Sequence, residues 1–123
     1  MAETILVCVT GQSSSARLIH KGAEIAQVHD AKLLVLSVSD NGLNTMTNPG
    51  VVQALDELYR LSSTVGAEMT MLHATDARKA IHDFARDREV TRIVLGQRRD
   101  SDGAFVAALM RSLPKISFII EAT

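Results

Sequence analysis

One short apolar run near the start of the chain decides the expected fold: Ile5-Leu6-Val7-Cys8-Val9. The run does not alternate between apolar and polar side chains, as a strand with one solvent-facing side would. Continuous apolarity over so short a stretch is typical of a strand covered on both faces, as in a parallel sheet between two layers of helices. Residues 33–38, Leu-Leu-Val-Leu-Ser-Val, and 93–95, Ile-Val-Leu, have the same character, and we expect them in the same sheet.

Two further runs complete the expected sheet. Ile116 to Ile120 follows Pro114 and is apolar apart from Ser117. The stretch Met69-Thr70-Met71-Leu72 alternates, which predicts a strand nearer an edge, with both methionines in the core. The longest connection runs from Ser39 to Pro49 and is rich in glycine and asparagine, which predicts a mobile lid.

Stretches with a helical period separate the apolar runs. We expect four helices: Ser13 to about Val28, about Val51 to Val65, one capped by Asp76 that begins at Ala77, and about Gly103 to Ser112. We expect the second helix to direct one line of side chains toward the core, with Leu58 beside this line. The line consists of Val52, Leu55, Tyr59 and Ser62. This alternation predicts a doubly wound α/β fold, because right-handed crossovers place helices on both faces of a parallel sheet.

Length and composition place the chain among one-domain globular proteins. It has 123 residues, of which 46% are hydrophobic and 22% charged, and we expect residues 1–123 to form a single domain. The formal charge is −1, so no basic field is available to hold a nucleic acid or an anionic membrane. The one cysteine, Cys8, is expected to be buried and inert, and with the short first apolar run it predicts a cytoplasmic protein.

The patterns of several common chemistries are missing from the sequence. Neither a Walker run nor a G-x-G-x-x-G fingerprint follows the first expected strand, and the serines after Gly11 lack the second glycine of a nucleophile elbow. The four histidines are scattered, and the loop at Asp100 lacks the carboxylate that closes a calcium site, so we expect no metal. We expect no catalysis, because no nucleophile, base and orienting group are matched.

One basic feature points to a ligand. In a doubly wound sheet the ligand lies beyond the carboxyl ends of the strands, where the strand order reverses. Arg98 and Arg99 follow one expected strand, residues 13–15 open the first helix, and Arg111 and Lys115 flank the end of the last helix. Together these groups predict an anion site, with an ordinary solvated basic loop as the open alternative.

Three segments resemble universal stress protein domains: Ile5-Leu6-Val7-Cys8-Val9-Thr10-Gly11, Thr75-Asp76-Ala77-Arg78-Lys79-Ala80-Ile81 with Phe84-Ala85, and Val90-Thr91-Arg92-Ile93-Val94-Leu95-Gly96. The likeness is greatest to the universal-stress-like domain of bacterial potassium-responsive sensor histidine kinases and spans nearly the whole chain. It implies a five-stranded parallel sheet in the order 3-2-1-4-5 with four helices. It also implies a homodimer joined through the last strand, in the region of Ile116, Phe118 and Ile120.

The resemblance also implies a nucleotide site. Many members bind ATP through an acidic residue after the first strand, and through G-x-x-G, nine residues, then Gly-Ser/Thr after the fourth. Here Thr10 stands in place of the acidic residue, Arg99 replaces the second glycine, and Arg111-Ser112 falls near the last pair. The candidate nucleotide-binding residues are Val9, Thr10, Gly11, Ser13, Ser14, Val38, Gly96, Gln97, Arg98, Arg99 and Ser112.

These departures predict that arginine side chains hold the phosphates that a glycine backbone would otherwise cradle. We therefore expect a non-catalytic regulatory module of the universal stress protein type, without a certain cofactor, and with ATP or a cyclic dinucleotide as candidate ligands. A signalling protein is the expected partner besides a second copy. A ligand-free dimeric scaffold and a weak nucleotide hydrolase are the alternatives that the residues leave open.

Overall fold

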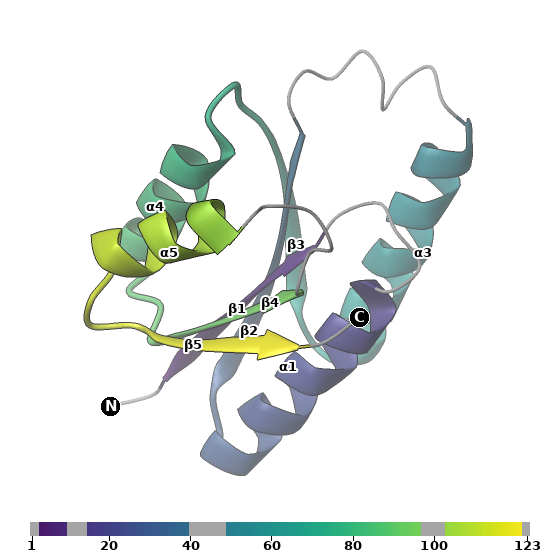
Figure 1. The fold of residues 1–123 in the computed structure, drawn as a ribbon. Helices are drawn as coiled ribbons and strands as arrows, with labels where there is room; N and C mark the ends of the chain where they lie inside the picture. The colour runs from purple at the N-terminus through teal and green to yellow at the C-terminus, as the bar shows by residue number, and fades with distance from the viewer. Residues whose placement is uncertain (1–2, 10–14, 40–48, 97–102, 122–123) are drawn as a thin grey trace.

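The computed structural model describes residues 3–9, 15–39, 49–96 and 103–121, in which strand and helix alternate (Figure 1). The elements in chain order are β1 Thr4–Val9, α1 Ser15–His29, β2 Lys32–Ser39, α3 Pro49–Thr64, β3 Glu68–His73, α4 Ala77–Asp87, β4 Arg92–Gly96, α5 Gly103–Ser112 and β5 Ser117–Glu121. This is the predicted succession. The predicted lid lies, apart from its end residues, outside the described residues.

The strands form one sheet in the order β3-β2-β1-β4-β5, and every pair in it is parallel. The predicted fold class and strand order are therefore confirmed. The central strand β1 is paired on both sides, since Val7 lies opposite Val35 of β2 and Val94 of β4. The alternating stretch 69–72 lies in β3, at one edge of the sheet, as predicted.

The helices cover both faces of the sheet, with α1 and α3 on one face and α4 and α5 on the other (Figure 1). Successive side chains of β1 point to opposite faces and so supply both layers. Leu6 packs in the cluster that contains Leu109 of α5, whereas Val7 packs in the cluster that contains Ile19 of α1. This burial on two faces is why the central strands are apolar without alternation.

Gly22 lets α1 lie close to β1. A Cβ atom built at this position would overlap Val7 Cγ2 and would lie 3.2 Å from Leu33 Cδ1. Val7 is fully buried and leaves no space into which its methyl group could move. The missing side chain therefore sets the distance between the helix and the central strand.

Three of the helices end with a residue in the left-handed region. Asp30 after α1, Gly66 after α3 and Glu89 after α4 have φ values of 50°, 77° and 54°. At each end the following amide reaches back into the last turn, as when Ala31 N donates to Ala26 O at 2.8 Å. This Schellman-type ending satisfies carbonyls that the helix leaves open and turns the chain towards the next strand.

The prediction that Tyr59 and Met71 face the core is wrong, because each is 55% exposed. In α3 the buried side chains are Leu58 and Ser62, and the Ser62 hydroxyl donates to Leu58 O at 2.7 Å. Tyr59 is about 100° further round the helix than Leu58 and so lies on its flank. Met71 belongs to an edge strand, which has a neighbouring strand on one side alone. Two other positions of the predicted line have side chains outside the described residues: Val52 and Leu55.

Glu3 holds the amino edge of the sheet together. Its Oε1 accepts from Arg92 Nε at 3.1 Å, and its Oε2 lies 3.1 Å from His29 Nδ1. The Thr91 hydroxyl donates to the carbonyl of Thr4 at 3.1 Å. These contacts join the start of β1, the end of α1 and the start of β4.

None of the helices in the described ranges is long and apolar enough to cross a bilayer.

Candidate functional site at the carboxyl edge of the sheet

The helices begin at the edge where the strands end. All strands are parallel and each helix connects the end of one strand to the start of the next, so the helices run opposite to the strands. Helix N-termini carry unpaired N–H groups and the positive end of the helix dipole. The carboxyl edge therefore favours an anionic ligand electrostatically.

The strand order reverses between β1 and β4. The connection from β1 to β2 runs over one face through α1, whereas the connection from β3 to β4 runs over the other face through α4. A crevice between the ends of β1 and β4 is the expected place for a ligand in this topology. Val9, which is 3% exposed, ends β1, and half-buried Gly96 ends β4. Val38 lies near the end of β2, so the structure brings these three predicted residues to one edge.

Most of the predicted ligand contacts belong to the two loops at this edge. They lie outside the described residues and stay predictions: Thr10, Gly11, Ser13, Ser14, Gln97, Arg98 and Arg99. Both loops follow described strand ends at the point where the strand order reverses, Val9 and Gly96, and both precede helices that begin at the same edge, at Ser15 and Gly103.

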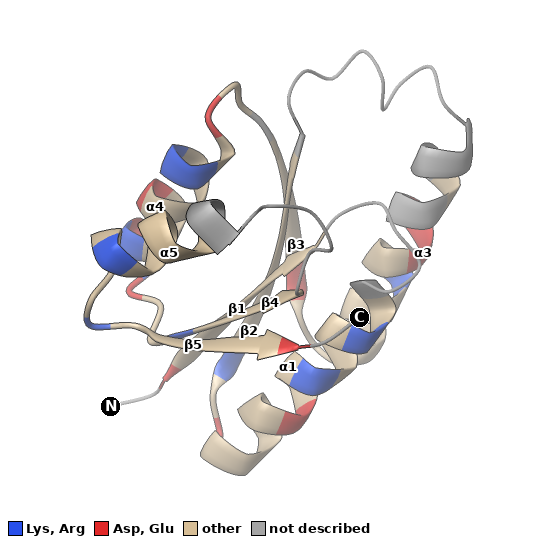
Figure 2. Cartoon of the chain, viewed as in Figure 1, with Lys and Arg blue, Asp and Glu red and all other residues tan. Residues whose placement is uncertain are grey.

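Ser112, Arg111 and Lys115 do not join the other predicted residues. Ser112 ends α5, and its hydroxyl donates to Leu109 O at 2.8 Å. The following strand starts opposite Arg92, the first residue of β4, so all three lie at the amino edge. Figure 2 shows basic residues at the end of α5 and before β5, near the tail of the β5 arrow. The prediction placed these residues at the anion site, whereas the structure places them at the opposite edge of the sheet.

Two features of the carboxyl edge were not predicted from the sequence. The first is Gly103, which begins α5 and therefore stands where Ser112 was expected to contribute. The second is a pair of cations, Arg78 and Lys79, in the first turn of α4. Cations are unfavourable near a helix N-terminus, so helix stability does not account for this pair. The Asp76 cap was predicted correctly, and its Oδ1 accepts from Lys79 N at 3.1 Å.

The described titratable groups near this edge offer little for covalent chemistry. Cys8 is half-buried against the α4–α5 layer, and desolvation raises the pKa of its thiol to about 12, so it is not a thiolate at neutral pH. In α4 a hydrogen bond from His82, together with the nearby Arg86 and Lys79 charges, lowers the pKa of Asp83. Within the described ranges, histidine, cysteine and acidic side chains do not form a group that could hold a metal ion.

Comparison with known proteins decides the family. The model of the universal stress protein family matches residues 1–112. The chain belongs to the universal stress protein family. Among curated relatives, the sensor protein KdpD of Mycobacterium tuberculosis is 32% identical over 100 residues, which is 80% of this chain and 11% of that protein. A putative sensor protein KdpD of Synechocystis is 28% identical over 126 residues, covering 98% of this chain and 34% of that protein.

Solved universal stress proteins share the fold. A universal stress protein from Archaeoglobus fulgidus has a TM-score of 0.74 at 20% identity, covering 98% of this chain and 93% of that one. A universal stress protein in complex with cAMP has a TM-score of 0.69 at 20% identity, covering 98% and 97%. A universal stress protein from Archaeoglobus fulgidus in complex with dAMP has a TM-score of 0.67 at 19% identity, covering 98% of this chain and 97% of that one. The solved structural relatives of this chain thus include complexes with an adenine nucleotide.

Proposed function

We propose that this universal stress protein chain is a non-catalytic regulatory module of the stress response that senses a nucleotide at the carboxyl edge. The reversal of strand order between β1 and β4 carries the proposal, with Val9 and Gly96 at the ends of these two strands. Structural relatives complexed with cAMP and dAMP support the ligand class. We further propose that residues 1–123 form one domain. The chain spans 11% of one KdpD relative and 34% of another, so a role in a larger sensor is part of the proposal.

The ligand we propose is a nucleotide held through phosphate by arginine side chains. Arg99 replaces a glycine that would let the backbone approach the phosphate closely. A guanidinium group can instead bind two phosphate oxygens at once. Arg78 and Lys79, in the first turn of α4, add positive charge at the same edge. We therefore expect ATP to bind weakly, with a dissociation constant on the order of 0.1 mM or poorer, and a cyclic dinucleotide to bind better.

Two observations support a non-catalytic role: the raised pKa of the Cys8 thiol and the positive charge at the carboxyl edge. A thiol with a pKa of about 12 is a poor nucleophile at neutral pH, and the permanently charged Arg78 and Lys79 at the edge suit anion binding rather than proton transfer. We also propose a cytoplasmic location, where a single free thiol is stable. A signalling protein is the proposed partner, in line with the sensor relatives.

Calorimetry on two paired variants tests the nucleotide site. ATP, cAMP and a cyclic dinucleotide are titrated into the wild type, into Arg98→Ala/Arg99→Ala, and into Arg111→Ala/Lys115→Ala as a control with the same charge change at the opposite edge. We expect the first variant to lose binding and the control to keep it. Phosphate release is followed in parallel, because turnover would identify a hydrolase. Equal affinity in all three proteins would remove the arginines from the site.

We propose in addition a homodimer through β5. This strand is at one edge of the sheet, and two apolar side chains near it are about half exposed: Ile120 of β5 at 43% and Met110 of α5 at 42%. An apolar strand edge pairs readily with a second chain. Sedimentation at high micromolar concentration is expected to give a dimer for the wild type, and Ile119→Lys is expected to give a monomer or insoluble protein, because Ile119 also packs against the α1–α3 core cluster. A wild-type monomer would contradict this part of the proposal.

A further inference from the structure

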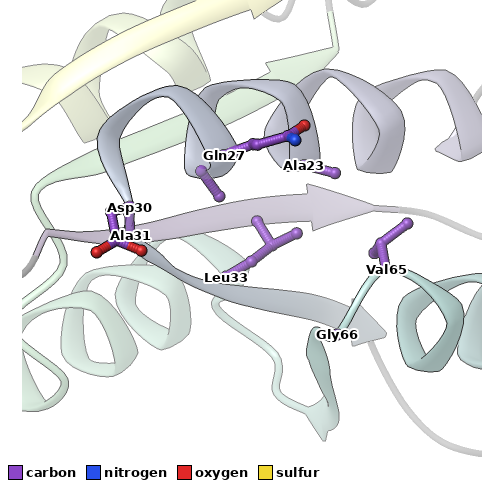
Figure 3. A pocket seen from close by; sticks show the side chains of 8 residues that line it. Ala23, Gln27, Asp30, Ala31, Leu33, Val65 and Gly66 are labelled. Carbon is purple, nitrogen blue, oxygen red and sulfur yellow. The ribbon is translucent and has the colours of Figure 1, made fainter.

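A cavity opens between the ends of α1 and α3, at the amino edge of the sheet and away from the proposed nucleotide site (Figure 3). Its volume is about 440 Å³, which lies in the range of cavities that hold small molecules. The lining comes from the last turns of α1, the start of β2 and the turn that follows α3. No part of the proposed function uses this cavity.

The floor of the cavity is apolar. Ala26 of α1 and Leu33 of β2 are buried, at 8% and 5% exposure, and belong to the core cluster of the α1–α3 layer. Ala23, Ala31 and Val65 are half-buried and pack against the same cluster. In Figure 3 the Leu33 side chain points up from β2 into the space between α1 and Val65. The small alanine side chains leave room that a short alkyl group would fill.

The rim of the cavity is negative. Asp30 is its one charged lining residue, and none of the ion pairs among the described residues includes this carboxylate. Both α1 and α3 end at the cavity, and each helix carboxyl end carries roughly half a negative charge. The other polar side chain, Gln27, is an uncharged amide that both accepts and donates hydrogen bonds, so the charge at the rim comes from Asp30 and the helix ends. The electrostatics therefore oppose an anion and favour a cation.

We propose that this cavity binds a small organic cation, an ammonium group that carries a short alkyl chain. The ammonium group pairs with the Asp30 carboxylate at the rim, and the alkyl chain covers Ala26 and Leu33. A neutral alkyl compound gains the apolar contact alone, and a carboxylate of the same length is repelled. A lysine side chain of a partner carries the same alkylammonium chemistry, and the lysine-rich peptide in the test below separates that source from a free small molecule.

An amide chemical-shift titration with butylammonium at constant ionic strength tests the proposal. The same titration with 1-butanol and with butyrate separates charge from apolar contact, and one with a lysine-rich peptide separates a free amine from a partner side chain. We expect saturable shifts for the amides of Ala31, Val65 and Gly66 with butylammonium, at a roughly millimolar dissociation constant. We expect much weaker effects with the other three compounds.

Two variants at matching positions complete the test. Asp30→Asn keeps the shape of the rim and is expected to weaken butylammonium binding by about two- to fivefold, the upper part of the range for one exposed ion pair. Glu89→Gln is the control, because Glu89 is also acidic, follows α4 and has a positive φ, but does not line the cavity. The proposal is overturned by equal binding of 1-butanol, by binding of the peptide alone, by equal losses in both variants, or by no saturation. None of these outcomes bears on the nucleotide site.

Discussion

Replacing Gly22 by alanine is expected to destabilise the protein, although alanine is the better helix former. A Cβ atom at this position would overlap Val7 Cγ2 and come within 3.2 Å of Leu33 Cδ1. Val7 is fully buried, and its strand is paired on both sides through Val35 and Val94, so neither the methyl group nor the strand can move easily. Either α1 has to shift away from the sheet or the side chain has to be strained.

The two opposing contributions decide the sign. Helix propensity favours alanine over glycine by about 1 kcal/mol, whereas overpacking in a close-packed core costs about 1–3 kcal/mol. Because the overlap is with a fully buried branched side chain, we expect the upper part of that range and a net loss of about 1–2 kcal/mol in the free energy of unfolding. The midpoint of thermal unfolding should fall by roughly 3–8 °C in a domain of this size.

Urea unfolding of four proteins measures this effect: wild type, Gly22→Ala, Val7→Ala and the double variant. Val7→Ala alone is expected to cost about 2 kcal/mol, and removing the overlapping methyl group should make the double variant more stable than the sum of the single losses by about 1 kcal/mol or more. The difference between Glu24→Ala and Glu24→Gly, at an exposed position in the same helix, reports the propensity difference between alanine and glycine. A Gly22→Ala protein that is more stable than the wild type would refute the reasoning.

Three further predictions concern single side chains. Glu89→Gly should raise the free energy of unfolding by about 0.5–1 kcal/mol, because Glu89 has a φ of 54°, where glycine is unstrained; no gain in urea unfolding would contradict this. The lowered pKa of Asp83, caused first by the His82 hydrogen bond, stabilises the fold above the ordinary aspartate pKa of about 3.9 and is lost as the pH falls through the folded-state pKa. Asp83→Asn should therefore lower the melting temperature near neutral pH and leave it unchanged in strong acid, and a loss that does not depend on pH would argue against this. Cys8, with a thiol pKa of about 12, should react slowly with a thiol reagent in the native protein and rapidly in urea; equal rates would show that the thiol is open to solvent.

The strands and the two helix layers were predictable because continuous apolarity in a short stretch indicates both. A strand that supplies two helix layers has no polar face, and Ile5 to Val9 is apolar throughout for that reason. The edge position of β3 could also be read, because Thr70 interrupts the apolar pattern between Met69 and Met71. Strand order depends on which loops cross which face, and it came from family resemblance.

Two predictions failed because they did not account for the direction in which a side chain points or a helix runs. Tyr59 is apolar and close to the core line, but helix packing leaves it on a flank that no neighbouring element covers fully, and local sequence does not report how far a helix overhangs its sheet. The prediction for Ser112 rests on its sequence distance from Gly96. The helix from Gly103 to Ser112 runs back across the sheet, so its start faces the ligand edge and its end does not. That direction follows from the predicted helix itself and could have been used.

Amide chemical-shift mapping with cAMP tests most directly whether a nucleotide binds at the carboxyl edge. The account predicts saturable shifts at Val9, Val38 and Gly96, which lie at or next to the ends of their strands at that edge, and unchanged amides at Lys32 and Ser117, which begin strands at the opposite edge. Shifts at Lys32 and Ser117 without shifts at Gly96, or no shifts at saturating nucleotide, would contradict the account.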